Sequence, residues 1–405
     1  MLGVNKVLAV YIGPAGFALL GQYQSLLQLL SMLSTNTINS GIVKHTAESE
    51  AEDDGSLPVE IWRVAIAYSL LASLLLFLLM FSFGSAIASL FLGSAEYSSV
   101  LIYFSISFFF MCANNIFLAI FNGKGLIVRL TLANSIGSLI SFITVALLAE
   151  AYGLWGALVG FSIYQGIWFS ATFFLARRLE WCRAKNFIGG FGSAAVKSLS
   201  AYFFMSLVTA CCIPISHLLI RSYISTEYSL EQAGYWDALL RFSNSYLSLG
   251  TTVLAVYYLP KLARIKSKSD LLSEILSGYK LVLPIGVMAA VIIYQYRELV
   301  VTTVYTDAFL PMANIVLLQL GGDVLKIGSW FLSYYLVAKA KTRQFVFSEV
   351  GFTISYVVLT VLFTEYLGYE FVVLGYFVNF LIYWIFMAFL IFRSNGLADQ
   401  DLAES

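Results

Sequence analysis

The chain has 405 residues, of which 60% are apolar, 16% aromatic and only 11% charged, and its mean hydropathy is +0.84. An ordinary soluble domain carries about 25% charged residues, so this composition excludes both a water-soluble core protein and a disordered chain. The 23 basic and 23 acidic residues balance, which leaves no basic surplus for a nucleic-acid partner. Because we find no alternation in segments of about ten residues, an outer-membrane barrel is also excluded. The composition therefore predicts an all-α polytopic membrane protein.

Apolar runs along the chain predict the membrane-spanning helices. One span needs about 20 apolar residues, so this length has room for about a dozen helices joined by short loops. Residues 1–12 resemble the end of one more span, shortened at its start, and make a poor signal peptide because no small-residue cleavage site follows. The predicted spans are 17–43, 61–83, 99–121, 127–149, 154–176, 196–220, 234–259, 281–305, 312–338, 344–364 and 371–392.

The positions of Lys and Arg predict the orientation of these spans. Eighteen of the 23 fall on one side of the predicted spans, where the longest loops are 44–60, 177–195 and 260–280. Three more fall within predicted spans, and only Arg221 and Arg297 fall on the opposite side. The positive-inside rule places the basic loops and the C-terminus in the cytoplasm. The polar segment 394–405 is expected to be a disordered cytoplasmic tail. The predicted location is the bacterial inner membrane.

Metal, disulfide and nucleotide chemistry find no support in the sequence. The four cysteines show no CxxC spacing, and histidine occurs only at positions 45 and 217. No G-x-x-x-x-G-K-[ST] loop is present, and no loop is long enough for a soluble catalytic domain. We therefore expect a chain that has no catalytic residues, metal or cofactor and is not an enzyme.

An internal repeat divides the chain into two halves. Glu150, Gly153 and Gly160 recur as Glu365, Gly368 and Gly375, about 215 residues later, and Gln24 aligns with Arg241 at a shift of about 217. Two halves with an even number of helices have the same orientation and are related by an axis along the membrane normal. The prediction is two six-helix lobes, about 12 transmembrane helices with the first one truncated. The N-terminal lobe is 1–177, the cytoplasmic linker is 178–195, and the C-terminal lobe is 196–393.

Four predicted spans carry polar side chains on one helical face. Charged residues inside a membrane usually face a bundle interior or a wet cavity, so these faces predict a hydrated cavity between the lobes. A second interpretation is open: acid and base one turn apart neutralise each other and only hold the bundle together. The candidate cavity residues are Lys6, Gln24, Asp237, Arg241, Asn244, Asp323 and Lys326.

Seven sequence blocks in order along the chain have a recognisable pattern: Lys6–Phe17, Gly21–Ser25, Ile38–Glu48, Asn122–Gly125, Ala233–Trp236, Tyr257–Leu262 and Gly322–Gly328. Together they cover nearly the whole chain and resemble Wzx-type O-antigen flippases, a family related to the lipid III flippase and placed in the MOP exporter superfamily. Members of that family begin upstream of the position of Lys6 with a full first helix, which we expect to be shortened here.

This resemblance implies a substrate, a direction and partners. Such flippases move a sugar repeat unit on undecaprenyl diphosphate from the cytoplasmic to the periplasmic leaflet by alternating access, coupled to an ion gradient or potential. An O-antigen polymerase and a chain-length regulator are the implied partners, besides the lipid bilayer. Lys6, Arg241 and Lys326 are then expected to contact the diphosphate, and Asp237 and Asp323 to neutralise them in the empty cavity.

Two other functions stay open. A drug or small-molecule antiporter of the same superfamily would need an acidic or aromatic cation site rather than a basic one. An O-antigen polymerase would need a long periplasmic loop with arginines, and the predicted loops on that side are short.

Overall fold

The computed structural model describes residues 2–32, 34, 38–51, 58–190, 192–254, 258, 261–262, 265, 268–338 and 342–401. Within these ranges the backbone forms helices and turns, and no strand occurs. This confirms the predicted all-α class. Tyr257, the first residue of the block Tyr257–Leu262, and parts of the loops 44–60 and 260–280 lie outside the described residues.

The helices follow the apolar runs closely. In chain order they are α1 (Leu2–Ser31), α2 (Asn39–Ala51), α3 (Val59–Leu92), α4 (Ser98–Gly123), α5 (Ile127–Ala176), α6 (Ala184–Phe187), α7 (Ser193–Glu227), α8 (Leu230–Val253), α10 (Lys268–Gln295), α11 (Arg297–Val304), α12 (Val316–Ala338), α13 (Thr342–Leu367) and α14 (Leu374–Asp401). The 3₁₀ segments are η2 (Ala95–Tyr97), η4 (Asp307–Asn314) and η5 (Tyr369–Phe371).

Most of these helices are long and apolar enough to cross a membrane. Within the described ranges seven pass that test, or eight when the bent pair of η4 and α12 is counted as one span. The 50-residue helix α5 is broken at Gly153, whose φ of 58° is left-handed, so it contains the two predicted spans 127–149 and 154–176. The chain is a multi-pass membrane protein.

Several helix boundaries differ from the predictions. The single span expected at 17–43 ends at Ser31, whose carbonyl accepts from the backbone N–H of Ser34 (2.9 Å), and a second helix begins at Asn39. The helix expected at 281–305 instead runs from Lys268 to Gln295. Its first turns are polar, so hydropathy alone predicts a loop there. The tail expected to be disordered is helical as far as Asp401.

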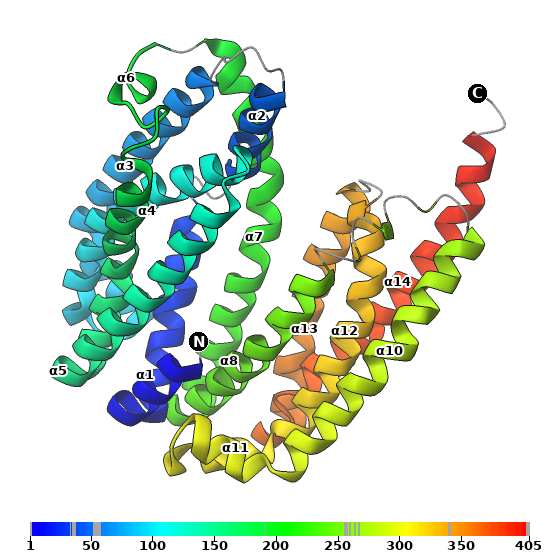
Figure 1. The fold of residues 1–405 in the computed structure, drawn as a ribbon. Helices are drawn as coiled ribbons and strands as arrows, with labels where there is room; N and C mark the ends of the chain where they lie inside the picture. Colours follow the sequence, from blue (N-terminus) through cyan, green and yellow to red (C-terminus); the bar gives the residue numbers. More distant parts are fainter. Residues whose placement is uncertain are drawn as a thin grey trace. The chain divides into compact units, whose positions relative to one another are not determined.

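The chain divides into two compact units, residues 19–218 and residues 1–18 with 219–405. In the first unit α4 packs between α3 and α5, and in the second α12 packs against α10 and α14 (Figure 1). The loop after α5 belongs to the first unit, because Trp181 is buried in its core and Arg63 of α3 donates to the carbonyls of Lys185 (3.0 Å) and Gly190 (3.2 Å). The lobe and linker boundaries stay a prediction.

The repeat is visible in how each unit packs its last two long segments. A Cβ on Gly160 would lie 3.0 Å from Cα of Val145, and a Cβ on Gly375 would lie 2.5 Å from Cα of Thr360. Gly375 follows Gly160 by 215 residues, and Thr360 follows Val145 by the same interval. The chain turns into the second segment at Gly153 and Gly368, which both have positive φ. The two halves therefore share a close, glycine-dependent helix contact.

A second pair of positions repeats with different side chains. Trp168 packs on Gly137 and donates its indole N–H to the carbonyl of Ala133 (2.8 Å). The equivalent Tyr383 packs on Phe352, with ring centroids 4.8 Å apart. The same two positions are in contact in both halves, but a large residue faces glycine in the first half and two aromatic residues face each other in the second.

This packing predicts an order of sensitivity to added volume. Gly375→Ala places a methyl group against backbone and should destabilise the protein by about 1–3 kcal/mol, more than Gly160→Ala, whose Cβ has more room. Gly351→Ala is the control, because no atom lies within 4 Å of its added Cβ. Thermal unfolding in detergent measures all three, and equal midpoints for Gly375→Ala and Gly351→Ala would contradict the close contact.

Candidate functional site

Three helices of the second unit, α7, α8 and α12, carry buried charged side chains: Arg221, Asp237 and Asp323. Helices α7 and α8 form a hairpin whose turn is capped by Ser229, which accepts from the N–H of Gln232 (3.1 Å). Tyr228, at the same turn, donates to the carbonyl of Thr364 (2.6 Å), and Tyr369 donates to that of Gln232 (2.7 Å). These bonds fix the hairpin on α13 and η5. Side chains on α7 and α8 are thereby held in register.

Asp237 is the centre of a buried ion cluster with two arginines. Its Oδ1 accepts from Nε of Arg221 (3.1 Å) and from Nη2 of the same guanidinium, and its Oδ2 accepts from Nε of Arg241 (2.6 Å). The side chains of Asp237 and Arg221 are 4% exposed, whereas that of Arg241 is 17% exposed. Two cations thus share one carboxylate, and the cluster, here called the Arg–Asp–Arg triad, carries one net positive charge.

Aromatic rings cover both arginines of the triad. The guanidinium of Arg221 lies 5.7 Å from the ring centre of Trp236, and that of Arg241 lies 5.5 Å from the ring centre of Phe17. Phe17 in turn packs edge-on against Tyr305, with centroids 5.7 Å apart. Cation–π contacts in a desolvated site favour the charged arginine.

Sequence reasoning missed Arg221. It was assigned to an extracytoplasmic loop because the preceding span was expected to end at residue 220, but α7 continues to Glu227 and buries it. The prediction of a simple pair between Asp237 and Arg241 is therefore incomplete. The available signal was the combination of Arg221 and Asp237, 16 residues apart across a short turn marked by Ser229.

Asp323 of α12 is satisfied by neutral donors. It accepts from the hydroxyls of Ser243 (2.8 Å), Tyr246 and Tyr376 (2.8 Å), and from the side-chain amide of Gln319 (3.2 Å). The residue is only 2% exposed. The carboxylate therefore ties α8, α12 and α14 together.

Lys326 does not pair with Asp323. Within the described residues no ion pair joins them, although they are three positions apart, so the second interpretation, a directly paired acid and base, does not hold for these two side chains. The Lys326 ammonium lies over three rings instead, 5.5 Å from Trp330, 5.5 Å from Tyr376 and 5.2 Å from Phe380. Because hydroxyl donors already satisfy the Asp323 carboxylate, the Lys326 ammonium is stabilised by the faces of the aromatic rings instead.

Lys6 contacts the backbone near the end of α11, and its expected contact with a diphosphate stays a prediction. Its ammonium donates to the carbonyls of Thr302 (2.8 Å) and Tyr305 at the C-terminal end of α11. Cations favour this end of a helix because its last carbonyls have no intrahelical donor. Lys6 therefore fastens the first segment of α1 to α11.

The two remaining candidates, Asn244 and Gln24, are not members of the triad. Asn244 is exposed on α8, one turn beyond Arg241, so the polar stripe of this helix runs from the buried Asp237 to an open surface. Gln24 is half-buried in the other unit. Its contribution to a cavity shared by both units stays a prediction.

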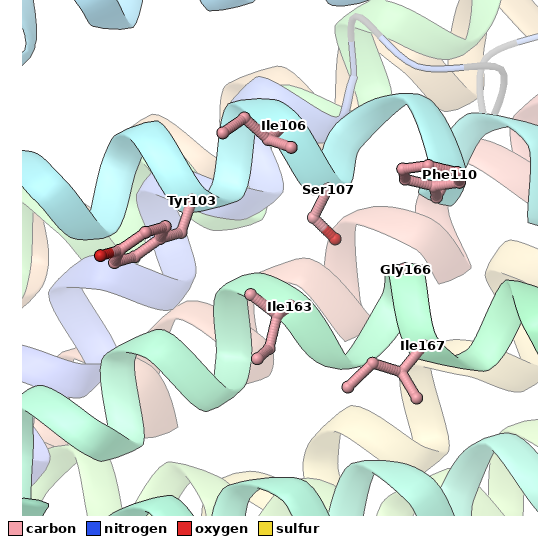
Figure 2. A pocket seen from close by; sticks show the side chains of 7 residues that line it. All are labelled: Tyr103, Ile106, Ser107, Phe110, Ile163, Gly166 and Ile167. Atoms are coloured by element: carbon pink, nitrogen blue, oxygen red, sulfur yellow. The ribbon is translucent and has the colours of Figure 1, made fainter.

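One hollow of about 300 Å³ lies between α4 and the second half of α5 (Figure 2). Its lining is apolar apart from two hydroxyls, and Figure 2 shows the Ser107 hydroxyl pointing to Gly166, where a Cβ would come within 2.7 Å of that oxygen. Tyr103, Ile106, Phe110 and Ile167 at its rim are exposed. Such a surface suits lipid and offers nothing to hold a charged ligand.

The fold and the triad define a multi-pass helical membrane protein with a buried cationic cluster. Residues 2–266 match the family described as polysaccharide biosynthesis protein, and the chain belongs to that family. The lipid III flippase of Escherichia coli (strain K12) is 26% identical over 356 residues, which cover 86% of this chain and 83% of the relative. The lipid III flippase of Shigella flexneri matches to the same extent.

Solved structures show the same fold. An inward-facing multidrug resistance MATE family transporter of the MOP superfamily superposes with a TM-score of 0.78 at 14% identity, covering 98% of this chain and 94% of that one. The lipid II flippase MurJ in an inward closed conformation gives 0.72 at 18% identity, covering 96% and 85%. The predicted MOP-type helical fold is confirmed.

The triad predicts unequal roles for its two arginines in stability. Arg221→Gln removes two buried hydrogen bonds and leaves Asp237 with one partner, so it should cost about 3 kcal/mol. Arg241→Gln leaves Asp237 bound to Arg221 and should cost about 1 kcal/mol. Thermal unfolding of the purified variants measures the difference.

The matched control is Arg297→Gln, since its side chain donates to the nearby carbonyl of Tyr294 and lies outside the triad. A midpoint for Arg221→Gln equal to that of the control would contradict the buried role given to Arg221.

Proposed function

We propose that this chain is a flippase for undecaprenyl-diphosphate-linked oligosaccharides, including O-antigen repeat units, and that it carries them from the cytoplasmic to the periplasmic leaflet. The observation that carries the proposal is the net positive charge of the Arg–Asp–Arg triad inside the membrane domain. An intramembrane charge is costly and marks a functional site by default. A family of polysaccharide biosynthesis proteins supplies the context.

The chemistry of the substrate fits this charge. A diphosphate and a glycan cannot enter hydrocarbon without losing their hydration, which no apolar surface replaces. The partly exposed Arg241 offers guanidinium donors to phosphate oxygens, and Lys326 adds a second cation, while Asn244 offers an amide to sugar hydroxyls. The polyprenyl tail stays in lipid.

The remaining features of the proposal concern setting and energy. The protein acts in the inner membrane with a cytoplasmic C-terminus, as a transporter and not an enzyme, and its cycle is alternating access driven by an ion gradient or the membrane potential. An O-antigen polymerase and a chain-length regulator are the expected neighbours, because they use the translocated unit. Lys6, on this view, supports the site through α11 instead of contacting substrate.

A drug antiporter is the second candidate, because a multidrug transporter shares this fold with a TM-score of 0.78. Cationic drugs would need the acids and aromatic rings of the site. Those rings already hold Lys326, and Asp237 already holds two arginines. The occupied acids and rings favour an anionic substrate.

Reconstituted transport tests the proposal. Vesicles with the purified chain should translocate undecaprenyl-diphosphate-linked glycan under an ion gradient or potential with no nucleotide present. Arg241→Ala and Lys326→Ala should each lower the rate at least tenfold, because one charge-assisted phosphate contact is worth roughly 1.5–3 kcal/mol. Arg241→Lys should keep part of the rate, since the charge persists and the guanidinium fork is lost.

The control is Arg297→Gln, which should transport at the unchanged rate. Two results would contradict the proposal: full transport by Arg241→Ala and Lys326→Ala together, or a wild-type chain that exports a cationic dye and no lipid-linked glycan. The second result would favour the antiporter.

The orientation is tested separately by reporter fusions. A reporter that is active only in the periplasm should work at one end of the bundle and fail at the other, following the basic loops. Periplasmic activity at position 187 would overturn the proposed orientation. Activity is expected after positions 94, 151, 226, 307 and 367, and none after 54, 187 and 270.

A further inference from the structure

The two arginines of the triad hold Asp237 in different ways. Arg221 directs two nitrogens at the single oxygen Oδ1 and is as buried as the carboxylate itself. Arg241 uses only Nε, and no described residue accepts from its terminal nitrogens. Arg241 is also the more exposed of the two, and its helix continues to the open surface at Asn244.

We propose that Asp237 takes the place of the substrate's anionic group when no substrate is bound. Arg241 then exchanges Asp237 for the substrate's phosphate oxygens, while Arg221 stays paired with the Asp237 carboxylate. This inference rests on the flippase function proposed above. Without substrate, the Nε–H of Arg241 donates to Oδ2 of Asp237. When a diphosphate arrives, Arg241 turns its guanidinium to the phosphate oxygens and leaves Oδ2.

The role of Arg221 follows from the cost of that exchange. In a simple pair, withdrawal of Arg241 would strand a buried carboxylate, and the substrate would have to offset the whole penalty. Arg221 keeps Asp237 paired in both states, so the exchange breaks only the hydrogen bond from Arg241 Nε to Asp237 Oδ2. Arg221 is therefore a positioning residue, which makes Arg241 available without contacting substrate.

The exchange weakens binding in a useful way. A cation that is free in the empty cavity would hold the diphosphate strongly and release it slowly. Competition from Asp237 lowers the affinity, so the substrate can leave on the far side. Transport and affinity should consequently respond in opposite directions when the competitor is removed.

Equilibrium binding of undecaprenyl diphosphate to the full chain in nanodiscs tests this, with undecaprenol as the matched neutral lipid. Asp237→Asn should bind the diphosphate about tenfold more tightly and transport glycan more slowly than wild type. Arg221→Gln should bind about tenfold more weakly, because Asp237 then retains Arg241. The double variant Arg221→Gln/Asp237→Asn should return to at least the wild-type affinity. Undecaprenol binding should not change in any of them.

Each alternative leaves its own pattern. If Arg221 itself contacted the phosphate, the double variant would stay as weak as Arg221→Gln. If the triad served packing alone, affinity would follow the unfolding midpoint, and Asp237→Asn would not tighten binding. Either result overturns the exchange. The double variant introduces a neutral pair of similar volume, so it guards against a failure to fold.

The same experiment separates this inference from the function beneath it. A wild-type chain that binds diphosphate and undecaprenol equally would overturn the proposed flippase function, and the exchange with it. A wild type that prefers the diphosphate but whose Asp237→Asn variant binds no more tightly would overturn the exchange alone.

Discussion

The need to keep a buried carboxylate paired organises the second unit of this protein. Breaking a buried ion pair by removing one partner costs about 3–5 kcal/mol, and the penalty is felt most where water is excluded. Asp237 avoids it by holding Arg221 of α7 and Arg241 of its own helix at once. The α7–α8 hairpin, its Ser229 cap and the tyrosines that fasten it to α13 and η5 all serve to keep those three side chains in register.

Two similar sequence patterns, an acid followed by a base four or three positions later, lead to different outcomes in this unit. Asp237 with Arg241 and Asp323 with Lys326 are both acids followed one turn later by a base. Only the first forms an ion pair. The carboxylate of Asp323 instead accepts hydrogen bonds from hydroxyl and amide groups on three helices. Neutral donors satisfy the acid at lower desolvation cost than a second buried charge would. The lysine is then held by aromatic faces, a weaker and more adjustable contact.

Most of the fold could be predicted from hydropathy, because each span must satisfy its own backbone and so must be an apolar helix. The break in α5 at Gly153 and the repeat of its packing at Gly375 were also visible as spaced glycines. The charge partners were not. Helical periodicity shows which residues share a face of one helix, but Arg221 reaches Asp237 from another helix, and Lys6 reaches α11 across the sequence. Those contacts depend on tertiary packing, which no local pattern records.

The repeat duplicates the scaffold without duplicating the charges. Helix α4 corresponds to α12 at a shift of 215, yet Asp323 and Lys326 are matched by Phe108 and Met111, which are both buried and neutral. Arg241 is matched by Gln24, and the position of Asp237 by Leu20. Glycine contacts and helix turns are kept in both halves, so packing constrains them equally. Among the described residues the buried charged side chains, Arg221, Asp237 and Asp323, lie in one half, where they also join neighbouring helices. A single anionic group needs a single set of cations, so this one-sided placement agrees with the anion site proposed above.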